Sequence, residues 1–104
     1  MPLLPVKKEV FNWIKAGYKT IDVRKGNPAH GDIAVIQCGN SHLRLPIIKI
    51  ETGYLTDVIH ADNFRLVVPT AATLRDALDY LERLYCTKGG IFTAYYLQTK
   101  PENE

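Results

Sequence analysis

The chain has 104 residues, of which 46% are hydrophobic and 23% charged, and its formal net charge is +2. These values are close to those of soluble globular proteins and exclude a disordered or fibrous chain. A chain of this length buries roughly two thirds of the surface that its unfolded form exposes. We therefore expect one domain over residues 1–97, followed by a polar, flexible tail over residues 98–104.

Membrane insertion and export are not expected from this sequence. No stretch approaches eighteen consecutive apolar residues, and the first segment places its apolar residues before its lysines, the reverse of a secretory signal. We therefore expect a cytoplasmic protein. Cys38 and Cys86 lack the spacing of a metal site, so we expect two reduced, buried thiols, no metal and no cofactor.

The first predicted element is an amphipathic helix over residues 6–16, in which apolar residues recur every three or four positions. Gly17 is predicted to end it. Residues 19–24 then alternate strictly between apolar and polar side chains. This pattern predicts a half-buried strand with Asp22 and Arg24 on its polar face.

Two further strands are predicted to form a hairpin. Residues 32–38 are rich in β-branched side chains, a turn follows at residues 39–41, and residues 43–51 resume the strand pattern. Pro46 lacks an N–H group, so it requires an edge position or a bulge partway along the second of these strands.

The next part of the chain carries mixed signals. We predict a short helix over residues 56–61, capped by Thr56, and then a loop. A longer helix begins at Thr73, because Thr73 and Asp76 fit a capping box and apolar residues keep helical spacing after them. Lys88 and the two glycines after it are predicted to end this helix.

The last predicted element is a strand over residues 91–97, which is rich in aromatic and β-branched residues. The elements do not alternate as they do in a doubly wound sheet. We therefore predict a monomeric α+β domain in which a small curved or barrel-like sheet packs against two to three helices. The expected core comprises Val10, Ile14, Ile21, Val23, Ile33, Val35, Leu78 and Leu81.

Positive charge is concentrated at the start of the chain. Residues 1–25 contain six lysines and arginines but only two acidic residues, whereas the remainder is net acidic. A local basic surface attracts phosphate groups even when the whole molecule is nearly neutral. A solvated, lysine-rich helix face explains the same charges, so both interpretations stay open.

Lys19, Asp22 and Arg24 are the candidate site residues. A lysine is a compact cation whose pKa falls when it loses water, so Lys19 suits a phosphate or, if buried, a catalytic base. Arg24 offers two parallel hydrogen bonds, and Asp22 can orient it or accept from a nucleobase amino group. Alternation places Lys19 on the opposite face unless it lies in the turn before the strand. A simple Asp22–Arg24 ion pair on the sheet surface is the alternative.

The segment from Ala16 to Arg24 resembles the G-x-K-x-x-E-x-R signature of ASCH domains (activating signal cointegrator homology), with Asp22 where glutamate is usual. Residues 30–32 and the final strand are also similar to segments of that family. The resemblance implies a PUA-like β-barrel with a cleft beside the first helix and strand, in a superfamily associated with RNA binding.

The resemblance also implies an enzymatic alternative. One ASCH branch deacetylates N4-acetylcytidine with a Lys-x-x-Thr pair and a later glutamate, and ribonuclease activity is attributed to others. Lys19 keeps the first position, but Asp22 replaces the threonine and Thr70 falls near the expected glutamate. A carboxylate beside Lys19 is expected to raise the pKa of its amine, which disfavours a lysine base.

The leading hypothesis is a small RNA-binding or modified-nucleoside-binding domain. Its expected ligand-binding residues are Lys19, Asp22 and Arg24, with Lys15 and Tyr18 beside the signature. A hydrolase acting on N4-acetylcytidine or RNA, with Lys19 and Asp22 as catalytic residues, is the alternative, and a protein-interaction module is a third.

Overall fold

The computed structural model describes residues 1–87 and 89–99. The predicted helix stop at Lys88 and the tail residues 100–104 lie outside this description. Within it, strands and helices follow one another in this order: β1 (Leu3–Pro5), α1 (Lys8–Ala16), β2 (Ile21–Lys25), β3 (Ile33–Cys38), β4 (Ser41–Gly53), α2 (Leu55–Val58), α3 (Phe64–Val67), α4 (Leu74–Tyr85) and β5 (Phe92–Leu97).

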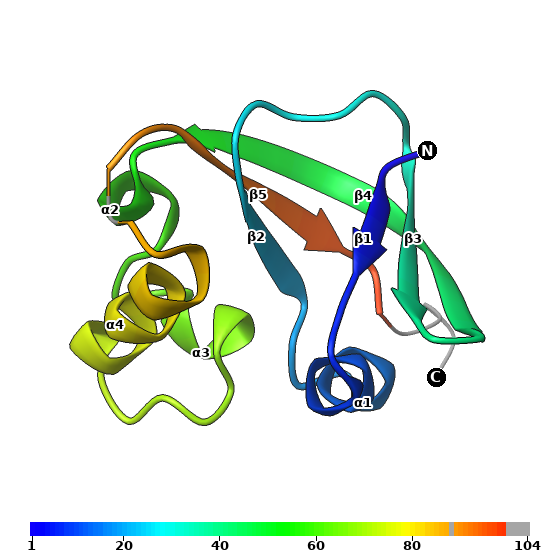
Figure 1. Ribbon diagram of the computed structural model, residues 1–104, viewed down its shortest axis with the longest axis horizontal. Helices are drawn as coiled ribbons and strands as arrows, with labels where there is room; N and C mark the ends of the chain where they lie inside the picture. The colour runs from blue at the N-terminus through cyan, green and yellow to red at the C-terminus, as the bar shows by residue number, and fades with distance from the viewer. Residues whose placement is uncertain (88, 100–104) are drawn as a thin grey trace.

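The strands form one mixed sheet in the order β1-β3-β4-β5-β2. β1 runs parallel to β3, and the other neighbours are antiparallel. The long strand β4 pairs with β3 through its first half and with β5 through its second (Figure 1). The sheet curls so far that Arg24 Nη2 on edge strand β2 donates to the Pro5 carbonyl on the opposite edge strand β1, at 3.0 Å. The predicted α+β class with a curved sheet is thus confirmed.

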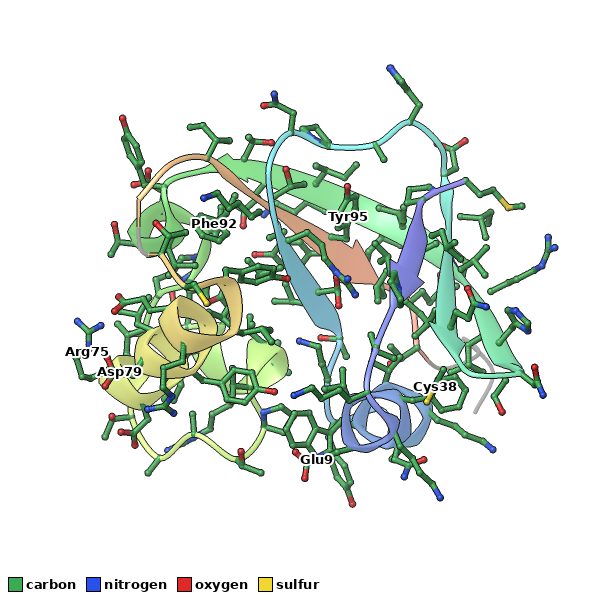
Figure 2. The ribbon with its side chains drawn as sticks, in the orientation of Figure 1. Glu9, Cys38, Arg75, Asp79, Phe92 and Tyr95 are labelled. Atoms are coloured by element: carbon green, nitrogen blue, oxygen red, sulfur yellow. The ribbon has the colours of Figure 1, made fainter. Side chains whose placement is uncertain are left out.

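Apolar residues pack on both faces of this half-barrel. Because β5 alternates, Phe92 and Ala94 face the core beneath α2, α3 and α4, whereas Tyr95 and Leu97 face the core closed by α1. Figure 2 shows Phe92 near α2 and Tyr95 farther along β5, toward β1 and β3. The helices on the two sides therefore rest on opposite faces of the same strand.

The predicted core is only partly confirmed. Five of its members are buried, namely Ile14, Ile21, Val23, Leu78 and Leu81. Val10, Ile33 and Val35 are half-buried instead. In β3 the fully buried residues are Ala34 and Ile36. The prediction that Ile33 and Val35 form the inner face of this strand is therefore wrong. The thiols were also misplaced, since Cys38 is half-buried and Cys86 is exposed, although both are free.

Strand β1 was not predicted. It follows Pro2 and ends with Pro5, and prolines are unfavourable inside a sheet. An edge strand pairs on one side only, so it needs few N–H donors of its own. Here the Val35 N–H group donates to the Pro2 carbonyl, and the Val6 N–H group donates to the Gln37 carbonyl. Of the two arrangements expected for Pro46, an edge position or a bulge, the structure has a bulge nearby, because the β4–β5 register shifts between Ile47 and Lys49.

The helical segments after β4 correct two predictions. Helix α2 begins at Leu55 rather than at residue 56, and its cap is not Thr56: the Tyr54 N–H group donates to the Asp57 carboxylate at 2.9 Å. Helix α3 occupies part of the expected loop, so four helices flank the sheet within residues 1–87 and 89–99, rather than the expected two to three.

Helix α4 has the predicted start, and its last residue is Tyr85. The Thr73 hydroxyl accepts from the Asp76 N–H group at 3.1 Å, which confirms this cap. The helix ends at Tyr85, where Cys86 adopts a left-handed conformation with φ of 57°. Among the described residues, no helix has both the length and the apolar character needed to cross a membrane.

Candidate functional site

A cleft of about 360 Å³ opens between α1 and α4, beside β2. All three candidate residues, Lys19, Asp22 and Arg24, line it. Lys19 and Asp22 are buried, so they lie at its floor, whereas Leu84 is exposed and lies at its mouth. Its walls are mainly apolar and aromatic and include Val6, Val10, Trp13, Tyr80, Leu84 and Tyr85.

The turn between α1 and β2 brings Lys19 to the floor. Gly17 ends α1 with a φ of 87°, and the N–H groups of Tyr18 and Lys19 both bond to the Trp13 carbonyl. Lys19 therefore precedes the alternating part of the strand, which begins at Ile21. This position frees its side chain from the alternation that would otherwise place it on the face opposite Asp22.

The Lys19 ammonium group is held by the main chain. Its Nζ atom donates to the Ile21 carbonyl at 2.8 Å and to the Val67 carbonyl at 2.5 Å, and the residue is only 6% exposed. An ammonium group has three N–H donors, so one remains for a ligand.

The surroundings of Lys19 also change its acidity. Burial lowers the pKa of Lys19 to about 8, although the charge of Asp22 acts to raise it and that of Arg24 acts to lower it. Asp22 therefore acts on this pKa in the expected direction, but the net pKa is lowered because burial, which the sequence did not show, has the larger effect. The cost of burying the charged amine outweighs the attraction of the carboxylate.

Asp22 and Arg24 form a two-point pair. The Arg24 Nε atom lies 2.6 Å from Asp22 Oδ2, and Nη2 lies 3.3 Å from Oδ1. Burial acts to lower the pKa of Arg24, but the charge and hydrogen bonds of Asp22 outweigh it and raise the pKa, so the guanidinium stays charged. The remaining nitrogen, Nη1, can serve a ligand. The pair thus does more than decorate the sheet, because Arg24 also joins β2 to Pro5 of β1.

The α4 side of the cleft contributes aromatic rings that the sequence did not single out. The Tyr85 hydroxyl donates to the Val23 carbonyl at 2.8 Å, and its ring packs edge-on against Phe92 with centroids 5.8 Å apart. Burial raises the pKa of Tyr85 to about 12, so its hydroxyl stays protonated. Helical periodicity makes such rings look like core residues, and only the packing of α4 near β2 brings Tyr80 and Tyr85 to the cleft.

Three residues considered from the sequence lie outside the lining of the cleft. Lys15 and Tyr18, expected to bind the ligand, are both exposed. Thr70, near the position expected for a catalytic glutamate, is exposed as well. Asp22 is therefore the one carboxylate among the described lining residues.

No family model matches this chain, and neither does any curated protein. Its fold is similar to that of solved structures. The hypothetical protein PH0355 matches with a TM-score of 0.73 at 14% identity, over 92% of this chain and 95% of that one. The ASCH protein from Zymomonas mobilis matches with a TM-score of 0.64 at 19% identity, over 92% of this chain and 65% of that one. A point mutant of the Zymomonas mobilis protein matches with a TM-score of 0.67 at 18% identity, over 92% of this chain and 67% of that one. The chain therefore has the fold of an ASCH domain.

Proposed function

We propose that the cleft binds a modified nucleoside or a single unpaired nucleotide of RNA. The observation that carries this proposal is the combination of aromatic and apolar walls with a floor that offers both hydrogen-bond donors and an acceptor. A nucleobase has the matching form, because its faces are apolar and its edge carries polar groups.

The walls favour a flat, uncharged ring. Trp13, Tyr80 and Tyr85 line the cleft together with aliphatic side chains. Stacking on aromatic rings contributes roughly 1–3 kcal/mol per base in proteins that bind single strands. The volume of about 360 Å³ lies near the lower end of the usual range for small-molecule pockets. It suits one nucleoside rather than a double-stranded segment.

The floor favours a base with one donor and two acceptors on its edge. The Asp22 carboxylate retains lone pairs beside its bonds to Arg24, so it can accept from an exocyclic amino group. The third N–H of Lys19 and the Nη1 group of Arg24 can donate to a ring nitrogen and a carbonyl. The Watson–Crick edge of cytosine carries this complementary set.

Isothermal titration calorimetry with cytidine, N4-acetylcytidine and uridine tests the proposal. Leu84→Trp replaces a branched aliphatic side chain at the mouth by a bulkier indole that obstructs entry, and should weaken binding at least tenfold, a loss of about 1.4 kcal/mol. Leu66→Trp is a matched control, because Leu66 also lies on a helix, is 42% exposed where Leu84 is 47% exposed, and lies outside the cleft lining. Absence of binding by all three nucleosides and by cytidine 5′-monophosphate would defeat the proposal and favour a protein-interaction module.

A second candidate, an amide hydrolase, is favoured by one observation. A pKa of about 8 leaves Lys19 partly neutral in mildly alkaline solution, as a lysine base requires. However, Asp22 has no hydroxyl nucleophile and is held by Arg24. We therefore expect binding of N4-acetylcytidine with slow or absent release of acetate, measured by chromatography. Robust turnover that Lys19→Met abolishes would establish the hydrolase instead.

A further inference from the structure

A second hollow adjoins the mouth of the cleft. It has a volume of about 420 Å³ and is lined by Lys7, Tyr80, Arg83 and Leu84. Lys7, Tyr80 and Leu84 also line the cleft itself, so the two spaces share a border. Arg83 lines this outer hollow but not the cleft.

The outer hollow carries two cations that are not neutralised by ion pairs. Lys7 immediately precedes α1, Arg83 lies in the last turn of α4, and both are exposed. Within the described part of the chain, neither forms an ion pair, whereas Arg75 on the same helix α4 is engaged by Asp79 and Glu82. Lys7 and Arg83 are therefore available to an anion from solvent.

The cations inside the cleft are already committed. Lys19 donates to two carbonyls and Arg24 to Asp22 and Pro5, so their remaining donors suit the edge of a base better than the charge of a phosphate. A nucleotide carries its phosphate one sugar away from its base. A base held at the floor would direct that phosphate toward the mouth.

We propose that Lys7 and Arg83 form a phosphate subsite at the mouth of the cleft, so that the ligand is a nucleotide rather than a free nucleoside. This inference rests on the proposed function, which places the base in the cleft. The phosphate belongs either to a mononucleotide or to the backbone of an RNA strand, and both present the same anionic oxygens to the two cations.

One acidic residue opposes this subsite and sharpens its test. Burial, together with the negative charge of Glu9, raises the pKa of Tyr80, which borders both hollows. Figure 2 shows Glu9 on the side of α1 that faces α4. Glu9→Gln should therefore increase the affinity ratio of cytidine 5′-monophosphate to cytidine. An unchanged or lower ratio would contradict a phosphate beside Tyr80.

Calorimetry at low salt tests the subsite with four probes: cytidine, its 5′-monophosphate, its 3′-monophosphate and the trinucleotide CpCpC without terminal phosphates. At least one phosphate-bearing probe should bind roughly tenfold more tightly than cytidine, as a charge-assisted hydrogen bond allows. A gain for the monophosphates alone assigns the subsite to a terminal phosphate, and a gain for CpCpC assigns it to the backbone.

Variants separate this inference from the proposed function. Arg83 lines the outer hollow but not the cleft, so Arg83→Gln should reduce the gain from phosphate while leaving cytidine affinity unchanged. The rest of that gain should disappear when Arg83→Gln is combined with Lys7→Gln. Lys8→Gln is the matched control, because Lys8 is the next residue, is exposed and lines neither hollow. Cytidine binding without any gain from phosphate would overturn the subsite and leave the proposed function standing. Absence of binding by all four probes would overturn both.

Discussion

Two arginine–carboxylate pairs of this protein have the same chemistry in opposite environments. At the cleft, Arg24 Nε lies 2.6 Å from Asp22 Oδ2, and the two side chains are 25% and 5% exposed. On α4, Arg75 Nη2 lies 2.9 Å from Asp79 Oδ1, and the two side chains are 61% and 45% exposed. Figure 2 shows the second pair on the outer side of α4, away from the sheet.

The comparison shows that environment, not geometry, decides what such a pair contributes. An exposed pair adds little, since water and salt screen it. A buried pair adds little net stability when intact, but removing one partner leaves a charge without compensation. Arg24 also joins the two edges of the curled sheet through Pro5. The residues that mark the cleft therefore also hold its shape.

The largest expected effect comes from breaking the buried pair. Arg24→Ala leaves the Asp22 carboxylate buried alone and should lower the free energy of unfolding by about 3–5 kcal/mol. Urea denaturation measures this loss. Replacing both residues by alanine should recover part of it, because the Asp22 carboxylate is then no longer buried without its arginine partner. A loss below about 1 kcal/mol in Arg24→Ala would mean that the pair behaves like a surface pair.

Lys19 sharpens the comparison through pH. Its pKa is about 8 in the folded chain against 10.5 when unperturbed, so the unfolded state binds more protons between these values. Stability should therefore rise with pH in this window, by about 3 kcal/mol for this one group. The measurement is the difference in unfolding free energy between the natural protein and Lys19→Met, followed from neutral pH to pH 10.5. A difference that does not change with pH would show that Lys19 keeps its ordinary pKa.

Loss of the helix cap at Thr73 should destabilise the chain by an amount between the effects expected for the two ion pairs. Thr73→Ala removes the hydroxyl that caps α4 and should destabilise the chain by about 1 kcal/mol. Thr56→Ala is the matched control, because Thr56 is exposed and does not cap α2. Equal effects of the two substitutions in thermal denaturation would remove the special role of the cap.

The smallest expected effect is that of the exposed pair. Arg75→Ala removes the contacts to both Asp79 and Glu82, yet the melting temperature should stay unchanged within error, because the exposed Arg75 side chain is screened by water in both contacts. Melting curves at low and high salt check this. A clear loss at both salt concentrations would contradict the distinction between the two environments.

Local periodicity predicted those elements whose sequence alternates or repeats clearly, such as α1, β2, α4 and β5. It failed where the local sequence pattern does not indicate how a segment packs against the rest of the chain. β3 carries apolar side chains on both faces, so alternation alone did not show that Ala34 and Ile36 point inward. Pro2 before β1 and Pro5 at its end likewise hid this strand, which pairs with the distant strand β3.

The candidate site was predictable only as a set of residues. The short spacing from Lys19 to Arg24 placed its polar groups together. Their hydrogen-bond partners were not accessible from the sequence, because Val67 and Pro5 are distant in the chain and bind through main-chain carbonyls. The aromatic wall from α4 was missed for the same reason, since it depends on how that helix packs.

Trp13 offers the most direct measurement of the central claim, that the cleft holds a nucleobase. It is the single tryptophan of the chain and lines the cleft. Titration with cytidine 5′-monophosphate, excited where tyrosines do not absorb, should quench its fluorescence in a saturable way through stacking. Ribose 5-phosphate should leave the emission unchanged. Unchanged emission with the nucleotide, or equal quenching by the sugar phosphate, would contradict the account.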